Sequence, residues 1–164
     1  MAILPIRVYP DPVLREKTNP VEQITPEIHR LIDDMAETMY AAPGVGLAAN
    51  QVGSLWRLFT VDIAGEDEPS DFRVFINPEI IEKQGHIRWK EGCLSFPEVA
   101  ENIERASKVR VRAMNRDGEI FEMEAEGLLA VAIQHEAEHL DGKLLIDQLG
   151  PVRRRLVLRR LGKK

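Results

Sequence analysis

The pattern H-E-x-x-H at residues 135–139 is the part of the sequence best suited to chemistry. His135 and His139 stand four residues apart, so on a helix they share one face and can hold one metal ion. Glu136 points about a quarter-turn away and can reach a water molecule at the ion without displacing a ligand. A metal ion lowers the pKa of that water, and the carboxylate accepts its proton. A solvent-facing charged helix is the alternative, but two of only four histidines stand at ligand spacing.

A catalytic metal site of this kind needs a third protein ligand, and spacing alone leaves its identity open. After His139 the chain has no His, Glu or Cys, so branches of the H-E-x-x-H class that take a downstream histidine or glutamate are excluded. Two aspartates, Asp141 and Asp147, remain on that side. The upstream candidates are Cys93, His29 and His86.

Cys93 is the only cysteine, so the chain cannot form an intramolecular disulfide. It lies in residues 91–97, which we expect to be a loop because Gly92 precedes the cysteine and Pro97 follows it closely. Its role is open between a buried small side chain, a nucleophile activated by histidine, and a thiolate ligand. The ligand role explains more, because a thiolate and two imidazoles leave one open position for water.

A third segment, GVGLAANQ at residues 44–51, is rich in small side chains, and we expect it to belong to a glycine-rich loop over residues 44–53. Its glycines imitate a dinucleotide-binding loop, but it follows a predicted helix and no β-α-β unit surrounds it. Small residues instead allow close approach of a ligand or of another segment. Gln51 offers an amide donor for a developing oxyanion, although by itself it is typical of a plain polar loop.

Together the three segments resemble those of peptide deformylase. The family carries G-x-G-x-A-A-x-Q, E-G-C-L-S and Q-H-E-x-x-H in this order. Residues 44–51, 91–95 and 134–139 match every fixed position. One motif alone would be a weak signal, whereas three in the right order make coincidence negligible. The general arrangement of the whole chain also looks like that of the bacterial enzymes.

The resemblance implies a metal-dependent hydrolase that removes the N-formyl group from the N-terminal formyl-methionine of nascent polypeptides and releases formate. Cys93, His135 and His139 would hold one divalent ion. Similar enzymes use Fe²⁺, and Zn²⁺, Ni²⁺ or Co²⁺ can substitute. Ligand type alone would favour zinc.

The resemblance also assigns the catalytic roles. Metal-bound water would attack the formyl carbonyl, with Glu136 as general base and then acid. The oxyanion would be stabilised by the side chain of Gln51 and by the backbone N–H of Leu94.

Helix geometry predicts an apolar slot beside the metal, suited to a methionine side chain. Leu128, Val131 and Ala132 lie seven, four and three residues before His135, on the same helix face. Ordinary core packing is the alternative for these three, and both roles are compatible. The residues predicted to bind substrate here are Leu128, Val131, Ala132, Val45 and Gly46.

The elements around these motifs predict an α+β fold. A helix should begin at Pro26, capped by Thr25, and end at Pro43-Gly44. Residues 126–140 should form a helix that is apolar nearly all round and therefore buried. The other expected elements are strands at 55–63 and 73–76, extended chain at 78–91 with a turn near Gly85, and a hairpin of strands 109–114 and 119–125.

The expected architecture is thus antiparallel or mixed sheets packed around a central buried helix that carries H-E-x-x-H. The resemblance places this helix at the centre of three sheets. We expect one catalytic domain over residues 1–164, ending in a short basic helix at about 151–164.

The charge distribution is uneven. Residues 153–164 carry seven of the 22 basic side chains and none of the 27 acids, so the remaining 15 basic and 27 acidic side chains give a net charge of −12. A basic tail on an acidic body predicts contact with an anionic partner, and the resemblance implies the ribosome, which the basic tails of some relatives contact. The tail looks shorter than in some relatives, and a merely solvated helix end is the alternative.

Location and assembly follow from simpler features. No stretch approaches 18 apolar residues, and the first residues lack the basic and long apolar regions of a signal peptide. We therefore expect no membrane span and a cytoplasmic location. We also expect a monomer, although nothing in the sequence determines the oligomeric state. Two rival functions remain: a small metallopeptidase with Asp141 or Asp147 as third ligand, and a ribosome-binding module with a closed, structural metal site.

Overall fold

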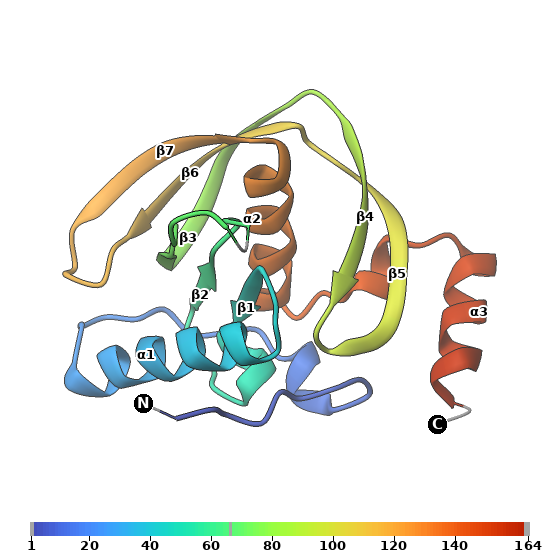
Figure 1. Ribbon diagram of the computed structural model, residues 1–164, viewed down its shortest axis with the longest axis horizontal. Coiled ribbons are helices and arrows are strands. Elements are labelled where there is room, and N and C mark those ends of the chain that lie inside the picture. Colours follow the sequence, from blue (N-terminus) through green and yellow to red (C-terminus); the bar gives the residue numbers. More distant parts are fainter. Residues whose placement is uncertain (1, 66, 163–164) are drawn as a thin grey trace.

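The helix that carries H-E-x-x-H, α2 (Gly127–Leu140), runs through the middle of the molecule between two sheets (Figure 1). The computed structural model describes residues 2–65 and 67–162, and its fold is α+β, as predicted. The other two α-helices in this part of the chain are α1 (Pro26–Ala41) and α3 (Pro151–Gly162). None of the helices described combines the length and the apolar character that crossing a bilayer requires.

All paired strands of both sheets are antiparallel. The five-stranded sheet has the order β1-β2-β3-β6-β7, with β1 (Gly46–Ala48), β2 (Leu58–Val61), β3 (Arg73–Gln84), β6 (Lys108–Met114) and β7 (Ile120–Glu126). The second sheet is the hairpin of β4 (Ile87–Cys93) and β5 (Phe96–Arg105). Within residues 2–65 and 67–162 the strands thus form two sheets, and the expectation of three is wrong.

Strand β3 is much longer than the expected 73–76, and it continues past Pro78. Proline lacks the N–H that a central strand needs, and the register shifts between Ile76 and Glu79 to accommodate it. Asn77 adopts a left-handed φ of 52° at this bulge. Its side chain exchanges two 2.8 Å hydrogen bonds with the backbone of Val21, which secures the bend.

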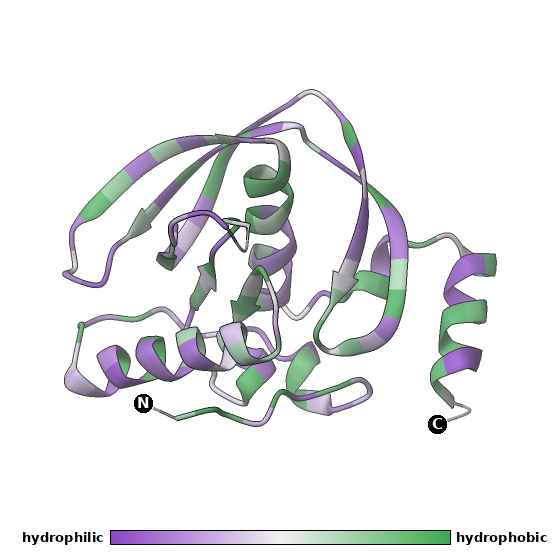
Figure 2. Ribbon diagram, viewed as in Figure 1, coloured by the Kyte–Doolittle hydropathy of each residue, from purple (hydrophilic) through white to green (hydrophobic). Residues whose placement is uncertain are grey.

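Two apolar clusters enclose the centre of the fold. Ala130 and Ile133 of α2 belong to one cluster with Phe59 and Phe75 of the large sheet. Helix α1 belongs to a second cluster with β1 and β2, and Thr25 caps its start by accepting a hydrogen bond from the N–H of Ile28, as predicted. Figure 2 shows α2 mostly hydrophobic along its first turns, which agrees with its burial. The large sheet therefore packs directly on α2, whereas α1 packs on β1 and β2.

A third cluster joins β5 to the end of the described chain. Phe96 and Ile103 of β5 pack with Ile146 and with Val157, a buried residue of α3. Arg153 of α3 also forms an ion pair with Glu101. Helix α3 consequently lies outside β5, on the edge of the molecule away from α1 (Figure 1).

Candidate metal centre

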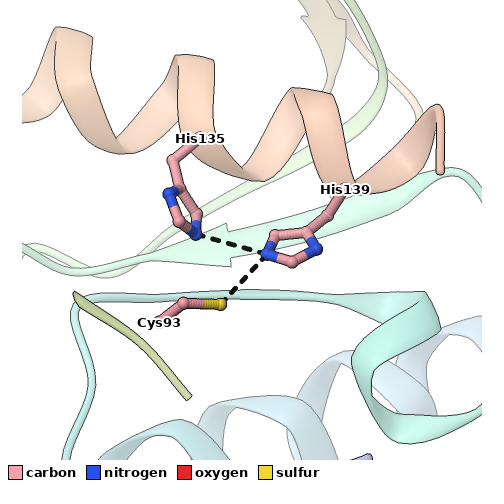
Figure 3. A group of neighbouring side chains, drawn as sticks. All are labelled: Cys93, His135 and His139. Atoms are coloured by element: carbon pink, nitrogen blue, oxygen red, sulfur yellow. Dashed lines mark hydrogen bonds between the residues drawn. The ribbon is translucent and has the colours of Figure 1, made fainter. Parts of the chain in front are cut away.

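The three side chains predicted to bind metal converge on one point (Figure 3). The sulfur of Cys93 lies 3.3 Å from Nε2 of His139. The same Nε2 lies 3.2 Å from Nε2 of His135. The three ligand atoms all lie within 4.8 Å of one another. In Figure 3 both imidazoles extend from α2 toward the cysteine at the end of β4.

These distances fit a divalent ion. With bonds of about 2.1 Å to nitrogen and about 2.3 Å to sulfur, tetrahedral ligand atoms stand roughly 3.4–3.6 Å apart. The observed 3.2 Å and 3.3 Å are close to those separations. Both histidines are buried, so the donors are shielded from water and already face one another. The donor set of one thiolate and two imidazoles suits a borderline-soft transition metal.

The other ligand candidates, His29, His86, Asp141 and Asp147, lie outside this group. Asp141 pairs with Arg57 at 2.9 Å, and Asp147 pairs with Arg15 at 2.5 Å. Both aspartates therefore have cationic partners away from the two histidines. The geometry favours Cys93 as the third ligand.

Cys93 lies at the end of a strand rather than in a loop. The expectation of a loop over 91–97 is wrong, because Cys93 is the last residue of β4 and β5 begins at Phe96. The register shifts between Gly92 and Cys93, so the pairing of β4 with β5 changes at the ligand itself. A bulge of this kind redirects a side chain at the end of a strand.

The buried ion pair of Glu91 and Arg105 orients the ring of His135 on the side away from the other two ligands. Nδ1 of His135 lies 2.9 Å from a carboxylate oxygen of Glu91, which leaves Nε2 for the metal. Arg105 donates two hydrogen bonds to the same carboxylate, at 2.8 Å and 2.9 Å, and also pairs with Glu138. Burial alone would raise the pKa of Glu91, but the hydrogen bonds from Arg105 and His135 lower it below its usual value. Glu91 therefore stays an anion that can fix the ring.

Sequence reasoning assigned no role to Glu91 or Arg105. Glu91 was matched only as a fixed position of its motif. Arg105 lies on the buried face of β5, where every second residue from Val99 onward is buried. A buried charge needs a partner. An arginine at a position that alternates with apolar residues could therefore have indicated a buried ion pair.

Glu136 is buried beside the cluster with one oxygen unpartnered. Its side chain contacts β1, where a Cβ added at Gly46 would lie 2.6 Å from Oε2. Its other oxygen, Oε1, is buried and has no hydrogen-bond partner. Burial raises the pKa of Glu136 to about 7. A carboxylate in this state is suited to take up and release a proton near neutral pH.

Gln51 presents its amide donor to the same cluster. The expectation of a glycine-rich loop over 44–53 is wrong, because this segment forms β1 and the short 3₁₀ helix η2 (Ala49–Val52). The N–H of Ala48 donates to the side-chain oxygen of Gln51 at 2.9 Å. The side-chain nitrogen donates to Ser95 at 3.0 Å and lies 3.7 Å from the sulfur of Cys93. The donor end of the amide therefore faces the ligand group.

A cavity of about 450 Å³ opens beside these residues. The structure brings all the predicted substrate-binding residues to its wall. Val45 is about half exposed, whereas Val131 and Ala132 are buried. Trp89, which sequence reasoning did not single out, is a further wall residue. The predicted residues along the wall are Val45, Gly46, Leu128, Val131 and Ala132, together with Gln51, Leu94 and Glu136.

Known proteins are similar to this chain in sequence. A family model described as polypeptide deformylase matches residues 3–155. The peptide deformylase of Syntrophobacter fumaroxidans is 52% identical over 164 residues, which cover 100% of this chain and 96% of the relative. The peptide deformylase of Alkalilimnicola ehrlichii is 52% identical over 163 residues, covering 99% of this chain and 91% of its own.

Solved structures agree with the sequence relatives. The crystal structure of a peptide deformylase from Legionella pneumophila has a TM-score of 0.92 and 44% identity, covering 99% of this chain and 95% of its own. The peptide deformylase from Ehrlichia chaffeensis in complex with actinonin has a TM-score of 0.93 and 34% identity, covering 99% of this chain and 98% of its own.

Proposed function

The chain belongs to the polypeptide deformylase family of hydrolases, and we propose that it removes the formyl group from the N-terminal formyl-methionine of nascent polypeptides. One observation carries the proposal. Cys93, His135 and His139 converge on one point, and Cys93, His135 and Glu136 line a single cavity there. A metal-assisted hydrolysis needs these groups within reach of one carbonyl.

Cys93, His135 and His139 would hold one divalent ion, which we propose to be Fe²⁺, with Zn²⁺, Ni²⁺ or Co²⁺ able to substitute. The bound ion would supply Lewis acidity, which lowers the pKa of water and polarises a carbonyl. Glu91 and Arg105 would keep the ring of His135 oriented for this role.

The side chains then divide the proton transfers and the charge stabilisation. Glu136 accepts a proton from the attacking water at its unpartnered oxygen. The water oxygen bonds to the formyl carbon, and negative charge develops on the formyl oxygen. The amide of Gln51 and the backbone N–H of Leu94 stabilise that charge. Glu136 returns the proton to the nitrogen as the carbon–nitrogen bond breaks. The formic acid that results loses its remaining proton, which the free amine can take up, and leaves as formate.

The shape and lining of the cavity favour methionine as the first residue of the substrate. Leu128, Val131 and Ala132 form an apolar wall on the same side of α2 as His135. An unbranched thioether fits an irregular apolar slot well. Val45 and Gly46 border the slot from the β1 side.

The direct test is formate release from formyl-Met-Ala-Ser, with metal content measured on protein purified without oxygen. We expect formate release from this peptide. We expect no acetate release from acetyl-Met-Ala-Ser, whose blocking group is larger by one methyl group. Cleavage at internal peptide bonds instead would favour the metallopeptidase alternative. Metal-loaded protein without either activity would refute the proposed function.

Gly46→Ala should lower kcat by about 10²-fold without loss of metal. The new methyl group would overlap Oε2 of Glu136, so the carboxylate must move, and a small misplacement of a catalytic group has an effect of this size. Gly150→Ala is the matched control, because a Cβ there meets no atom within 4 Å. Equal kcat values for the two variants would show that Glu136 tolerates displacement.

We also propose that the chain is a single catalytic domain whose basic end contacts the ribosome. All five arginines of α3 are exposed, while Val157 is buried against β5. Such a surface suits phosphate-rich RNA. Lys163 and Lys164, part of the predicted basic segment, lie outside the described residues. Since one chain supplies every residue of the site and the substrate is a nascent peptide, we propose a cytoplasmic monomer.

Replacing Arg154, Arg155 and Arg159 by glutamine should weaken binding to ribosomes and leave hydrolysis of the free peptide unchanged. The exchange spares Val157 and the pair of Arg153 with Glu101, so α3 should keep its packing. Co-sedimentation with ribosomes at low and moderate salt measures the effect, and wild-type binding should weaken steeply with salt. Equal binding by both proteins, or binding by neither, would identify α3 as a solvated end.

A further inference from the structure

The N-terminal segment joins two of the three motifs through the backbone. The N–H of Arg7 donates to the carbonyl of Gln51 at 2.6 Å. The hydroxyl of Ser95 donates to the carbonyl of Arg7 at 2.7 Å, and the N–H of Tyr9 donates to the carbonyl of Ser95 at 2.9 Å. Ser95 is completely buried. Residues 7–9 thus connect η2, which contains Gln51, to the turn of the β4-β5 hairpin.

These bonds determine the polarity of the Gln51 amide. A backbone carbonyl can only accept, so Ser95 uses its single proton on Arg7. The serine oxygen must then accept from the Gln51 nitrogen, which lies 3.0 Å away. At the other end of the amide, the N–H of Ala48 is a donor and therefore requires the side-chain oxygen of Gln51 as its acceptor. Two contacts therefore require the same orientation, with the second N–H of the nitrogen available on the Cys93 side.

We propose that Ser95 is a positioning residue, through which the backbone of the N-terminal segment fixes Gln51 as a donor toward the reacting carbonyl. This role rests on the proposed function. The two ends of an amide are similar in size, so a side chain without such contacts can turn over. A reversed amide would present an oxygen to the developing negative charge and would oppose the reaction. Ser95 acts through Gln51 and need not touch the substrate.

Ser95→Ala should lower kcat about tenfold with little change in KM, because the lost contact matters where charge develops. Thr38→Val is the matched control. The buried hydroxyl of Thr38 also donates to a carbonyl, that of Asp34 at 2.7 Å, and accepts from the N-terminal segment, from the N–H of Leu4 at 2.8 Å. It lies on α1, outside the site, so Thr38→Val should keep kcat even if the protein melts earlier.

A double-mutant cycle separates positioning from general destabilisation. In a Gln51→Ala background, Ser95→Ala should cause no further loss of kcat, because the side chain that it positions is gone. A further tenfold loss in that background would overturn the proposal. If Ser95→Ala does not fold, Ser95→Cys fills the space with a slightly larger side chain and a weaker donor, and serves in the same cycle.

A second readout does not depend on activity. The two side-chain amide protons of Gln51, assigned in an NMR spectrum by their loss in Gln51→Ala, should shift in Ser95→Ala and not in Thr38→Val. Unchanged signals in Ser95→Ala would overturn the proposal even if kcat fell. Wild-type protein that fails to release formate would refute the proposed function, whereas an active wild type with an additive cycle would refute only the role of Ser95.

Discussion

Glu136→Gln should lower kcat by roughly 10²–10⁴-fold while the fold and the metal content stay unchanged. Glutamine has nearly the same shape as glutamate, so it fits beside Gly46 without a new contact. It cannot accept a proton, and the proposed reaction needs Glu136 to take one proton and return it. Glu136 is only 5% exposed, so bulk water has little access to replace its carboxylate.

Glu37→Gln provides the matched control. Glu37 of α1 also has a buried carboxylate oxygen without a hydrogen-bond partner, but it does not line the cavity. Its exchange should leave kcat near the wild-type value. Initial rates on formyl-Met-Ala-Ser, with metal analysis and melting curves for both variants, make the comparison. Near-normal turnover by Glu136→Gln would remove Glu136 from the mechanism.

Cys93→Ala should lose most of the metal and, with it, nearly all activity. The exchange leaves two imidazoles from one helix, and those alone do not surround an ion. Loss of a group that merely orients a ligand typically costs 10–100-fold in metal affinity, so loss of the ligand itself should cost at least about 10²-fold. Metal content after dialysis against a weak chelator measures the effect directly.

Asp141→Ala and Asp147→Ala test the alternative third ligands. Both aspartates pair with arginines away from the two histidines, so both variants should retain the ion. Full occupancy in Cys93→Ala together with loss in either aspartate variant would reverse the assignment. Wild-type content in both aspartate variants would leave Cys93 as the third ligand.

The sequence predicted best the features that depend on neighbouring residues. The start of α1 follows from Thr25-Pro26, and the pairing of His135 with His139 follows from helical spacing. The apolar wall of the cavity follows from the same spacing, because Val131 precedes His135 by one turn. Each of these inferences needs only a few consecutive residues.

Features that depend on distant contacts were harder to predict. From residue types alone Cys93 remained one of several candidates, since 46 residues separate it from His139 and the β4-β5 hairpin brings them together. Strand β5 was not predicted. Its buried face carries Glu101 and Arg105, and such charges obscure the alternation of apolar and polar residues. Their partners lie on α3, α2 and β4, far away in sequence.

The bonds from residues 7–9 have a consequence for folding. The site draws on the chain from Arg7 to His139, so most of its contacts close long loops. Chains dominated by such contacts fold more slowly than helical chains of the same size. The two histidines can share a helix early, because their spacing is local. The Cys93 thiolate and the oriented Gln51 reach the histidines only when residues 7–9 and the β4-β5 hairpin have packed in place. A complete metal-binding centre should therefore form late in folding.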